Sequence, residues 1–220
     1  MTTLPVAGLV VAKAPVPGLA KTRLAATIGD VAAAHIAAAA LLDTLDAVAA
    51  APMQEKVVAL IGDLSEAALG DEIRQRLADF TVVAQRGSDF GDRLANAHAD
   101  ASTGLPVLQI GMDTPQVSTD MLTECAGELL GTAAVLGLAE DGGWWVLGVA
   151  DPAIAECLRA VPMSQSDTGA LTLAALYAQG VAVSLVAELA DVDTVDDIEA
   201  VRRMCPADSH FARATRAVGV

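Results

Sequence analysis

Short apolar runs alternate with longer amphipathic or alanine-rich stretches along this 220-residue sequence. Each short run, bounded by glycine, proline or charge, is typical of a buried strand, and each longer stretch has the length and spacing of a helix. We expect strands at 7–12, 56–61, 80–84, 105–110, 133–138, 144–149 and 181–186. We expect helices at 31–51, 64–77, about 95–101, 118–130, 151–160, 168–179 and 198–203. This order predicts an α/β fold, with a mostly parallel sheet between two layers of helices.

The turn Asp141-Gly142-Gly143 separates the apolar runs 133–138 and 144–149. Such a turn joins antiparallel strands, because a parallel connection needs a crossover of a dozen or more residues. The sheet is therefore expected to be mixed. No stretch is poor enough in apolar residues to form a linker, which predicts one domain over residues 1–205, followed by a loose tail over 206–220.

Asp113 stands alone where the apolar run 105–110 stops at Gly111, and Pro115 prevents continuation of the strand. In open α/β sheets, ligands bind beyond the carboxyl ends of the strands. A carboxylate at that point is suited to a metal-bound phosphate. The alternative is that Asp113 caps the following turn, which is ordinary loop chemistry for Asp before Thr-Pro.

The loop from Lys13 to Arg23 follows the first strand and supplies glycine and cations before a helix. In this arrangement backbone N–H groups hold a phosphate. The loop is not a Walker A motif, since Ala20 replaces the glycine before Lys21, and it lacks the G-x-G-x-x-G spacing of dinucleotide-binding folds. A solvated basic loop is the alternative interpretation.

Asp191 and Asp193 are separated by one residue, so both carboxylates lie on the same face of an extended segment. Mg²⁺ usually takes one or two such carboxylates and completes its shell with phosphate and water oxygens. The alternative is that Thr194 caps the last helix and that the surrounding acids favour the positive end of this helix.

The turn 141–143 precedes the only two tryptophans, Trp144 and Trp145. The glycines would let the backbone approach a substrate closely, and an indole offers a face to a sugar or a base. A hairpin turn followed by core aromatics is the alternative. Phe90 and Arg93 are suited to contact a base, and Phe90 fits equally well as a core anchor.

The composition restricts the class of partner. A formal charge of −15 argues against binding of a nucleic acid polymer, which requires clustered Lys and Arg. Cys125, Cys157 and Cys205 have no paired spacing, and so indicate neither a zinc site nor a disulfide framework. His35 and His98 fall within predicted helices without a partner acid and nucleophile, which leaves a catalytic triad without support.

The amino end lacks the basic region and longer apolar core of a signal peptide. No apolar segment of membrane-spanning length is free of charge or proline, so we expect a cytoplasmic protein without a membrane partner. A twofold homodimer is the default expectation, because it is the commonest oligomer of soluble proteins.

Together these segments resemble the DUF2064 family of small bacterial GT-A-type proteins, described as nucleotide-diphospho-sugar transferase-like. Five motifs occur in the family's order: 12–24, Gln85 with 90–94, 110–115, 141–148 and 191–194. The resemblance implies a GT-A fold, a Rossmann-like three-layer sandwich. In this fold a nucleotide lies over the loop after the first strand, and Mg²⁺ or Mn²⁺ bridges its diphosphate.

The resemblance also implies roles for individual residues. Nucleotide binding is expected from Ala12, Lys13, Pro15, Gly18, Lys21, Arg23, Gln85 and Arg93. The metal is expected at Asp113, Asp191 and Asp193, the last two by similarity to nucleotidyltransferases that activate phospholactate or phosphoenolpyruvate with GTP. The acceptor or sugar is expected at Asp141, Gly142, Gly143, Trp144 and Thr168. The expected catalytic groups are Asp113, Asp141 and Lys21.

Two departures from the family pattern concern the acceptor side. Trp144 stands where the family usually has tyrosine, which removes a phenolic hydroxyl. After Pro162 the chain reads Met163 to Thr168 where family members tend to carry Trp-Ser-Thr, so acceptor contacts there are in question.

Three functions are compatible with these residues. In glycosyl transfer, an acceptor hydroxyl attacks the anomeric carbon of a nucleotide-diphospho-sugar and the metal stabilises the departing diphosphate. In nucleotidyl transfer, a phosphate or carboxylate acceptor attacks the α-phosphorus of a nucleoside triphosphate and releases pyrophosphate. The third is a nucleotide-binding module without catalysis, against which the three acids argue. Pyrophosphorylases, which catalyse nucleotidyl transfer, typically carry a Gly-x-Gly-x-Arg loop, whereas the loop here has two prolines and one glycine. Sugar transfer to a small acceptor is therefore favoured.

Overall fold

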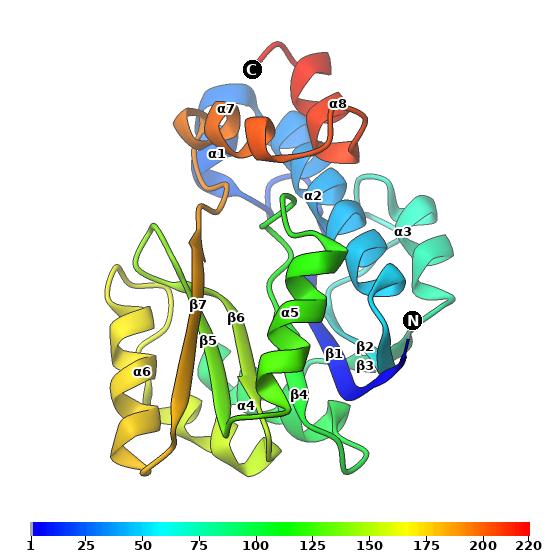
Figure 1. The fold of residues 1–220 in the computed structure, drawn as a ribbon. Coiled ribbons are helices and arrows are strands. Elements are labelled where there is room, and N and C mark those ends of the chain that lie inside the picture. The colour runs from blue at the N-terminus through cyan, green and yellow to red at the C-terminus, as the bar shows by residue number, and fades with distance from the viewer. Residues whose placement is uncertain (1) are drawn as a thin grey trace.

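The computed structural model describes residues 2–220 and shows an α/β fold in which helices cover both faces of a seven-stranded sheet (Figure 1). Residue 1, the first of the expected domain, lies outside the described part. The strands are β1 (Leu4–Lys13), β2 (Met53–Ile61), β3 (Thr81–Ala84), β4 (Val107–Ile110), β5 (Ala134–Ala139), β6 (Trp144–Val149) and β7 (Val183–Leu189). The helices are α1 (Thr22–Ile28), α2 (Asp30–Ala50), α3 (Gly70–Leu77), α4 (Phe90–Ala101), α5 (Thr119–Leu129), the 3₁₀ helix η1 (Pro152–Ala160), α6 (Thr168–Ala178), α7 (Val195–Met204) and α8 (His210–Ala217).

The strand order is β3-β2-β1-β4-β6-β5-β7, and β6 runs antiparallel to both of its neighbours. The expected mixed sheet and its β5–β6 hairpin are therefore confirmed. The other six strands run in one direction, so their carboxyl ends meet at one edge of the sheet. The chain goes from β1 outward to β2 and β3 before it returns to β4, which makes the gap beyond β1 and β4 the expected ligand site.

Three apolar clusters hold the layers together. One face of the sheet packs against α2, α3 and α5, and the other packs against α4, η1 and α6. The third cluster joins α1, α2, α7 and α8 at one end of the molecule (Figure 1). Helix α2 is rich in buried alanine, which lets its backbone approach the sheet closely.

Helix α2 meets the length and hydropathy of a membrane span, whereas the sequence predicts no such segment. In the structure, however, 67% of its most apolar 18-residue stretch is buried, as in the core helix of a folded domain.

The segment 64–77 is helical only from Gly70. The preceding residues make other hydrogen bonds: the Asp63 carboxylate accepts from the Ser65 N–H at 2.7 Å, and the Ala68 N–H donates to the Pro15 carbonyl at 3.0 Å. These bonds compete with a helical first turn. The segment instead ties the end of β2 to the loop after β1.

The tail expected after Pro206 is not loose, because it contains α8. Phe211 is fully buried against α2 and α7, and both oxygens of Asp43 on α2 accept backbone N–H groups of α8, from His210 and Phe211, at 2.8 Å. An amphipathic stretch of eight residues is too short to be recognised by itself, and its partners lie far away in the sequence.

Candidate active site

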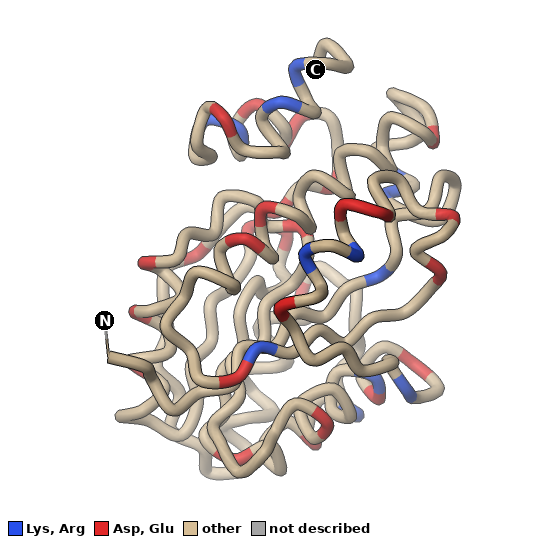
Figure 2. The backbone as a smooth tube through the Cα atoms, turned by 90° about the vertical axis from the view of Figure 1, so that its right-hand side faces the viewer, with Lys and Arg blue, Asp and Glu red and all other residues tan. Residues whose placement is uncertain are grey.

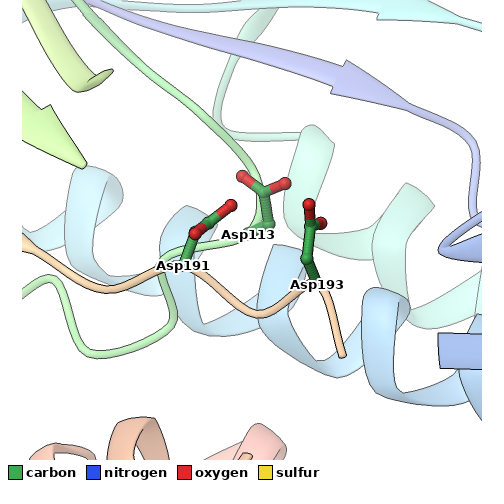
Figure 3. Close-up of side chains that lie close together, drawn as sticks. All are labelled: Asp113, Asp191 and Asp193. Atoms are coloured by element: carbon green, nitrogen blue, oxygen red, sulfur yellow. The ribbon is translucent and has the colours of Figure 1, made fainter. Parts of the chain in front are cut away.

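Three carboxylates from two distant segments converge beyond the carboxyl ends of the strands. Asp113 follows β4, and Asp191 and Asp193 follow β7; their carboxylates lie close together on the same side of the two segments (Figure 3). One oxygen from each lies within 4.8 Å of the others. The predicted convergence of these acids is therefore present in the structure.

The ammonium of Lys21 lies against two of the three acids. Its Nζ donates to Asp113 Oδ2 at 2.8 Å and to Asp193 Oδ1 at 2.9 Å, while Arg23 reaches the second oxygen of Asp193 at 3.2 Å. Lys21 adopts a left-handed backbone with φ of 45°, which is uncommon for a residue with a side chain. This turn directs the ammonium from the start of α1 back toward the end of β4. Asp113 is thus held by an ion pair, and the cap of α5 is Ser118.

Burial and neighbouring charges have opposite effects on the pKa values of Lys21 and Asp113. Burial alone would lower the pKa of Lys21, but the carboxylates of Asp113 and Asp193 raise it above its ordinary value. Burial would raise the pKa of Asp113, yet the Lys21 ammonium keeps it below its usual value. Asp191 forms no ion pair among the described residues, and its burial together with the charges of Asp141, Asp113 and Asp193 raises its pKa to about 7, although the charge of Lys21 acts in the opposite direction. The triad therefore holds more negative charge than the protein compensates.

The donor set fits a hard divalent cation. Mg²⁺ and Mn²⁺ prefer carboxylate oxygens, and a site that takes one or two carboxylates plus phosphate oxygens does not need a complete protein cage. The Lys21 ammonium already occupies a cation position between two of the acids. Asp and Glu are spread over the whole chain, whereas Lys and Arg are fewer (Figure 2).

A cavity of about 630 Å³ opens at this edge of the sheet, within the range of small-molecule sites. Twelve of the sequence-predicted site residues line it: Ala12, Lys13, Arg23, Gln85, Arg93, Asp113, Asp141, Gly143, Trp144, Thr168, Asp191 and Asp193. Lys21 lines an adjoining cavity of about 350 Å³, together with Lys13 and Arg23. The two cavities share Asp113 and Asp193, so the acids lie at their junction.

Three predicted residues line neither cavity: Pro15, Gly18 and Gly142. Gly18 turns the loop with φ of 79°, and the Pro15 carbonyl ties the loop to the segment after β2. A Cβ on Gly142 would lie only 1.8 Å from the Ser166 carbonyl oxygen, so no side chain fits there. The Gly142 carbonyl accepts a hydrogen bond from the Gly169 N–H. These residues shape the loops around the cavities.

The acceptor side of the cavity is built from the β5–β6 turn and the loop before α6. Asp141 Oδ1 accepts the Gly143 N–H at 2.7 Å, which leaves its other oxygen free of protein contacts among the described residues. The Thr168 hydroxyl donates to the Pro162 carbonyl at 2.9 Å and accepts the Gln165 N–H at 3.0 Å. Thr168 therefore fixes the loop, and Trp144 faces the cavity beside it.

Gln85 also has a structural contact that the sequence does not reveal. Its Nε2 donates to the carbonyls of Ala12 at 2.8 Å and Ala59 at 3.0 Å, which locks the ends of β1 and β2 together. The carbonyl end of its side chain remains available at the cavity wall.

Residues that the sequence does not single out also line the cavity, among them Gln109, Met112, Ser164 and Gln165. Met112 accepts the Lys13 backbone N–H on its sulfur at 3.2 Å, and Ser164 has a positive φ of 60°. The one available signal was Gln109, a lone polar residue inside the apolar run 105–110.

A family model described as "Uncharacterized protein conserved in bacteria (DUF2064)" matches residues 44–165, more than half of the chain. The chain belongs to the DUF2064 family. The matched segment contains Asp113 and the 141–145 turn, while the loop after β1 and the Asp191–Asp193 pair lie outside it. No curated protein sequence matches the chain.

Solved structures show the same fold. A "putative nucleotide-diphospho-sugar transferase" from Desulfovibrio desulfuricans G20 has a TM-score of 0.83 at 23% identity, over 99% of this chain and 97% of that one. A cytidylyltransferase from Leptospira borgpetersenii serovar Hardjo-bovis (strain JB197) has a TM-score of 0.58 at 12% identity, over 98% and 94%. Rv0371C from Mycobacterium tuberculosis H37Rv, in complex with manganese, has a TM-score of 0.55 at 19% identity, over 90% and 97%. The DUF2064 chain thus has a fold similar to that of nucleotidyltransferases and GT-A-type proteins.

Proposed function

We propose that this protein is a metal-dependent glycosyltransferase that transfers a sugar from a nucleotide-diphospho-sugar to a small acceptor. The observation that carries the proposal is the position of the three acids. Asp113, Asp191 and Asp193 lie at the junction of the cationic loop and the larger cavity. The oxygens of a diphosphate bind a divalent cation on one side and basic side chains on the other. Such a site therefore needs acids, which hold the metal, beside cationic residues.

The residues divide between the two parts of the donor. Lys13, Lys21 and Arg23 would hold the phosphates, and Ala12 and Gln85 would contact the nucleoside at the ends of β1 and β3. Asp113, Asp191 and Asp193 would hold Mg²⁺ or Mn²⁺, which supplies compensation for the charge that the diphosphate gains as it leaves. The indole of Trp144 would lie against the sugar or the acceptor.

In the proposed reaction the acceptor hydroxyl oxygen forms a bond to the anomeric carbon of the sugar. The bond between this carbon and the β-phosphate oxygen breaks, and the nucleoside diphosphate leaves with that electron pair. The hydroxyl proton passes to the free oxygen of Asp141, which is exposed at the cavity. Lys21 would turn from the acids toward the diphosphate and balance its charge.

Nucleotidyl transfer is the second candidate, and the fold similarity to a cytidylyltransferase favours it. In that reaction an acceptor phosphate or carboxylate attacks the α-phosphorus of a nucleoside triphosphate and pyrophosphate leaves. The loop after β1 has two prolines and one glycine, in place of the glycine-rich loop typical of pyrophosphorylases. This loop favours a diphosphate-linked sugar as the donor. The three clustered acids argue against a binding module without catalysis.

A thermal-shift panel tests the proposed donor. With Mn²⁺ and a nucleotide-diphospho-sugar at about 100 times its Kd, we expect a Tm rise of about 5–10 °C, because a ligand at this excess stabilises the folded state by about 2.7 kcal/mol. UDP-, GDP- and dTDP-sugars are compared with the four nucleoside triphosphates, each with and without Mn²⁺. A larger rise with a triphosphate than with every sugar donor would favour nucleotidyl transfer, and no metal-dependent rise with any nucleotide would contradict both candidates.

A further inference from the structure

Gln109 is a buried polar residue in an apolar layer that faces the cavity. It lies on β4 between Leu9 of β1 and Leu147 of β6, on the face of the sheet that packs against α4 and η1. The side chains beside it in that layer are apolar, and Gln109 itself is only 2% exposed. It nevertheless lines the cavity. An amide in this position costs free energy unless a partner satisfies it.

The protein leaves the oxygen of this amide without a hydrogen bond. Gln109 Oε1 has no partner among the described residues, so it is a free acceptor at the cavity. Behind it on α4, both ring nitrogens of the fully buried His98 are also without a partner. Burial lowers the pKa of His98 to about 4, although the neighbouring Gln109 side chain acts in the opposite direction. The imidazole is therefore neutral and supplies no charge behind the amide.

Arg93 lies on the same helix, just over one turn before His98, and lines the same cavity. Its guanidinium carbon lies 5.4 Å from the centre of the Phe90 ring, and its buried Nε has no hydrogen-bond partner in residues 2–220. Within the described chain Arg93 makes no ion pair, whereas Lys21 and Arg23 pair with the acids of the triad and Arg159 pairs with Asp92. An arginine held on an aromatic ring, with unused donors at a cavity, is prepared for an anion.

We propose that Arg93 and Gln109 form the pocket for the acceptor, in which Arg93 recognises a carboxylate or phosphate group on that molecule and the Gln109 carbonyl oxygen accepts a hydrogen bond from one of its hydroxyl groups. The pocket lies on the α4 and η1 side of the sheet, beside Trp144 and Met163, and apart from the phosphate loop that contains Lys21. The assignment rests on the proposed function, since it gives the second substrate its own charge and its own place. It moves Arg93 from nucleotide binding to the recognition of the acceptor. The acceptor is accordingly an acidic hydroxy compound.

The test uses the full-length ¹⁵N-labelled protein and three small probes of equal size class: glycerate, glycerol 3-phosphate and glycerol. Each is titrated with and without Mg²⁺ and UDP, while NMR follows the Gln109 side-chain amide and the Arg93 Nε–H. We expect glycerate or glycerol 3-phosphate to bind about 10-fold or more tightly than glycerol, because only the anions gain charge-assisted hydrogen bonds. The anion that binds more tightly, glycerate or glycerol 3-phosphate, shows whether the acceptor carries a carboxylate or a phosphate.

Matched variants locate the binding. Arg93→Gln is expected to remove the preference for anions, and Arg74→Gln, which makes the same change of charge on α3, is expected to keep it. Gln109→Leu is expected to weaken the binding of all three probes, each of which carries a hydroxyl, and to raise the Tm of the free protein, because the unsatisfied amide oxygen is replaced by an apolar side chain of similar size. A lower Tm would assign Gln109 a structural bond to His98 and overturn its role in the pocket.

Equal affinities for the three probes, an unchanged preference in Arg93→Gln, or signal changes confined to the Lys13–Arg23 loop would overturn the inference. A failure of UDP with Mg²⁺ to bind would instead contradict the proposed function, and the titrations without nucleotide would still report on the pocket. The two proposals therefore fail separately.

Discussion

Replacing Asp113 by asparagine is expected to lower the affinity for Mn²⁺ by a factor on the order of 100 or more and to abolish the metal-dependent Tm rise with nucleotide. Asparagine keeps the size of the side chain but removes one of three clustered charges. Loss of a partner that only supports a metal ligand already costs about 10–100-fold in affinity. Isothermal titration with Mn²⁺, alone and with a saturating nucleotide diphosphate, measures both effects.

Asp63→Asn is the matched control for this experiment. Asp63 also follows a glycine at the carboxyl end of a parallel strand, yet it is exposed and its carboxylate accepts the Ser65 N–H outside the triad. It should bind Mn²⁺ and nucleotide as the unaltered protein does. An Asp113→Asn protein that keeps the full metal-dependent Tm rise would remove Asp113 from the metal site.

Replacing Lys21 by methionine is expected to change metal and nucleotide binding in opposite directions. Without the ammonium between Asp113 and Asp193, only Arg23 still pairs with the triad, so Mn²⁺ alone should bind about 10-fold more tightly. The nucleotide diphosphate should bind about 10-fold less tightly, because a cation that faces its phosphates is lost. The free protein should lose about 1–2 kcal/mol of stability. This is less than for a fully buried pair, since the two acids are 38% and 31% exposed.

Arg23→Met controls for the loss of a positive charge in the same loop. The Arg23 side chain is 74% exposed and contacts only Asp193 of the triad, so its effects should have the same signs and be several times smaller. If Lys21→Met weakened the binding of both metal and nucleotide, its ammonium would not be a counter-ion that the metal replaces. Titrations of the two variants with Mn²⁺, and then with nucleotide, separate these outcomes.

The sequence predicts those parts of the fold and of the candidate site that follow from local pattern. Each strand is a run of apolar residues, and Asp113 and Asp191 come just after two of these runs. Because ligands bind beyond the carboxyl ends of the strands, the position of Asp113 follows from the α/β order, whereas the metal role of Asp191 and Asp193 was expected from the family resemblance.

Contacts between distant segments could not be predicted from the sequence in the same way. The Lys21 ammonium reaches acids that are 92 and 172 residues away, and no spacing in the sequence records that distance in space. Helix α8 depends on Asp43 of α2 for its first turn and on a cluster from three other helices for its buried face. Gln109 appeared as part of an apolar strand, and only the position of α4 shows that its amide faces a cavity without a partner.

The central claim is that Asp113, Asp191 and Asp193 hold one divalent cation opposite the cationic loop. The most direct measurement is a crystal structure of the full chain with Mn²⁺ and UDP, in which anomalous scattering locates the manganese. We expect one peak at about 2.1 Å from an oxygen of at least two of the three acids, with Lys21 turned toward the diphosphate. A manganese peak elsewhere, with Asp113 and Asp193 still paired to Lys21 and Arg23 while UDP is bound, would contradict the claim.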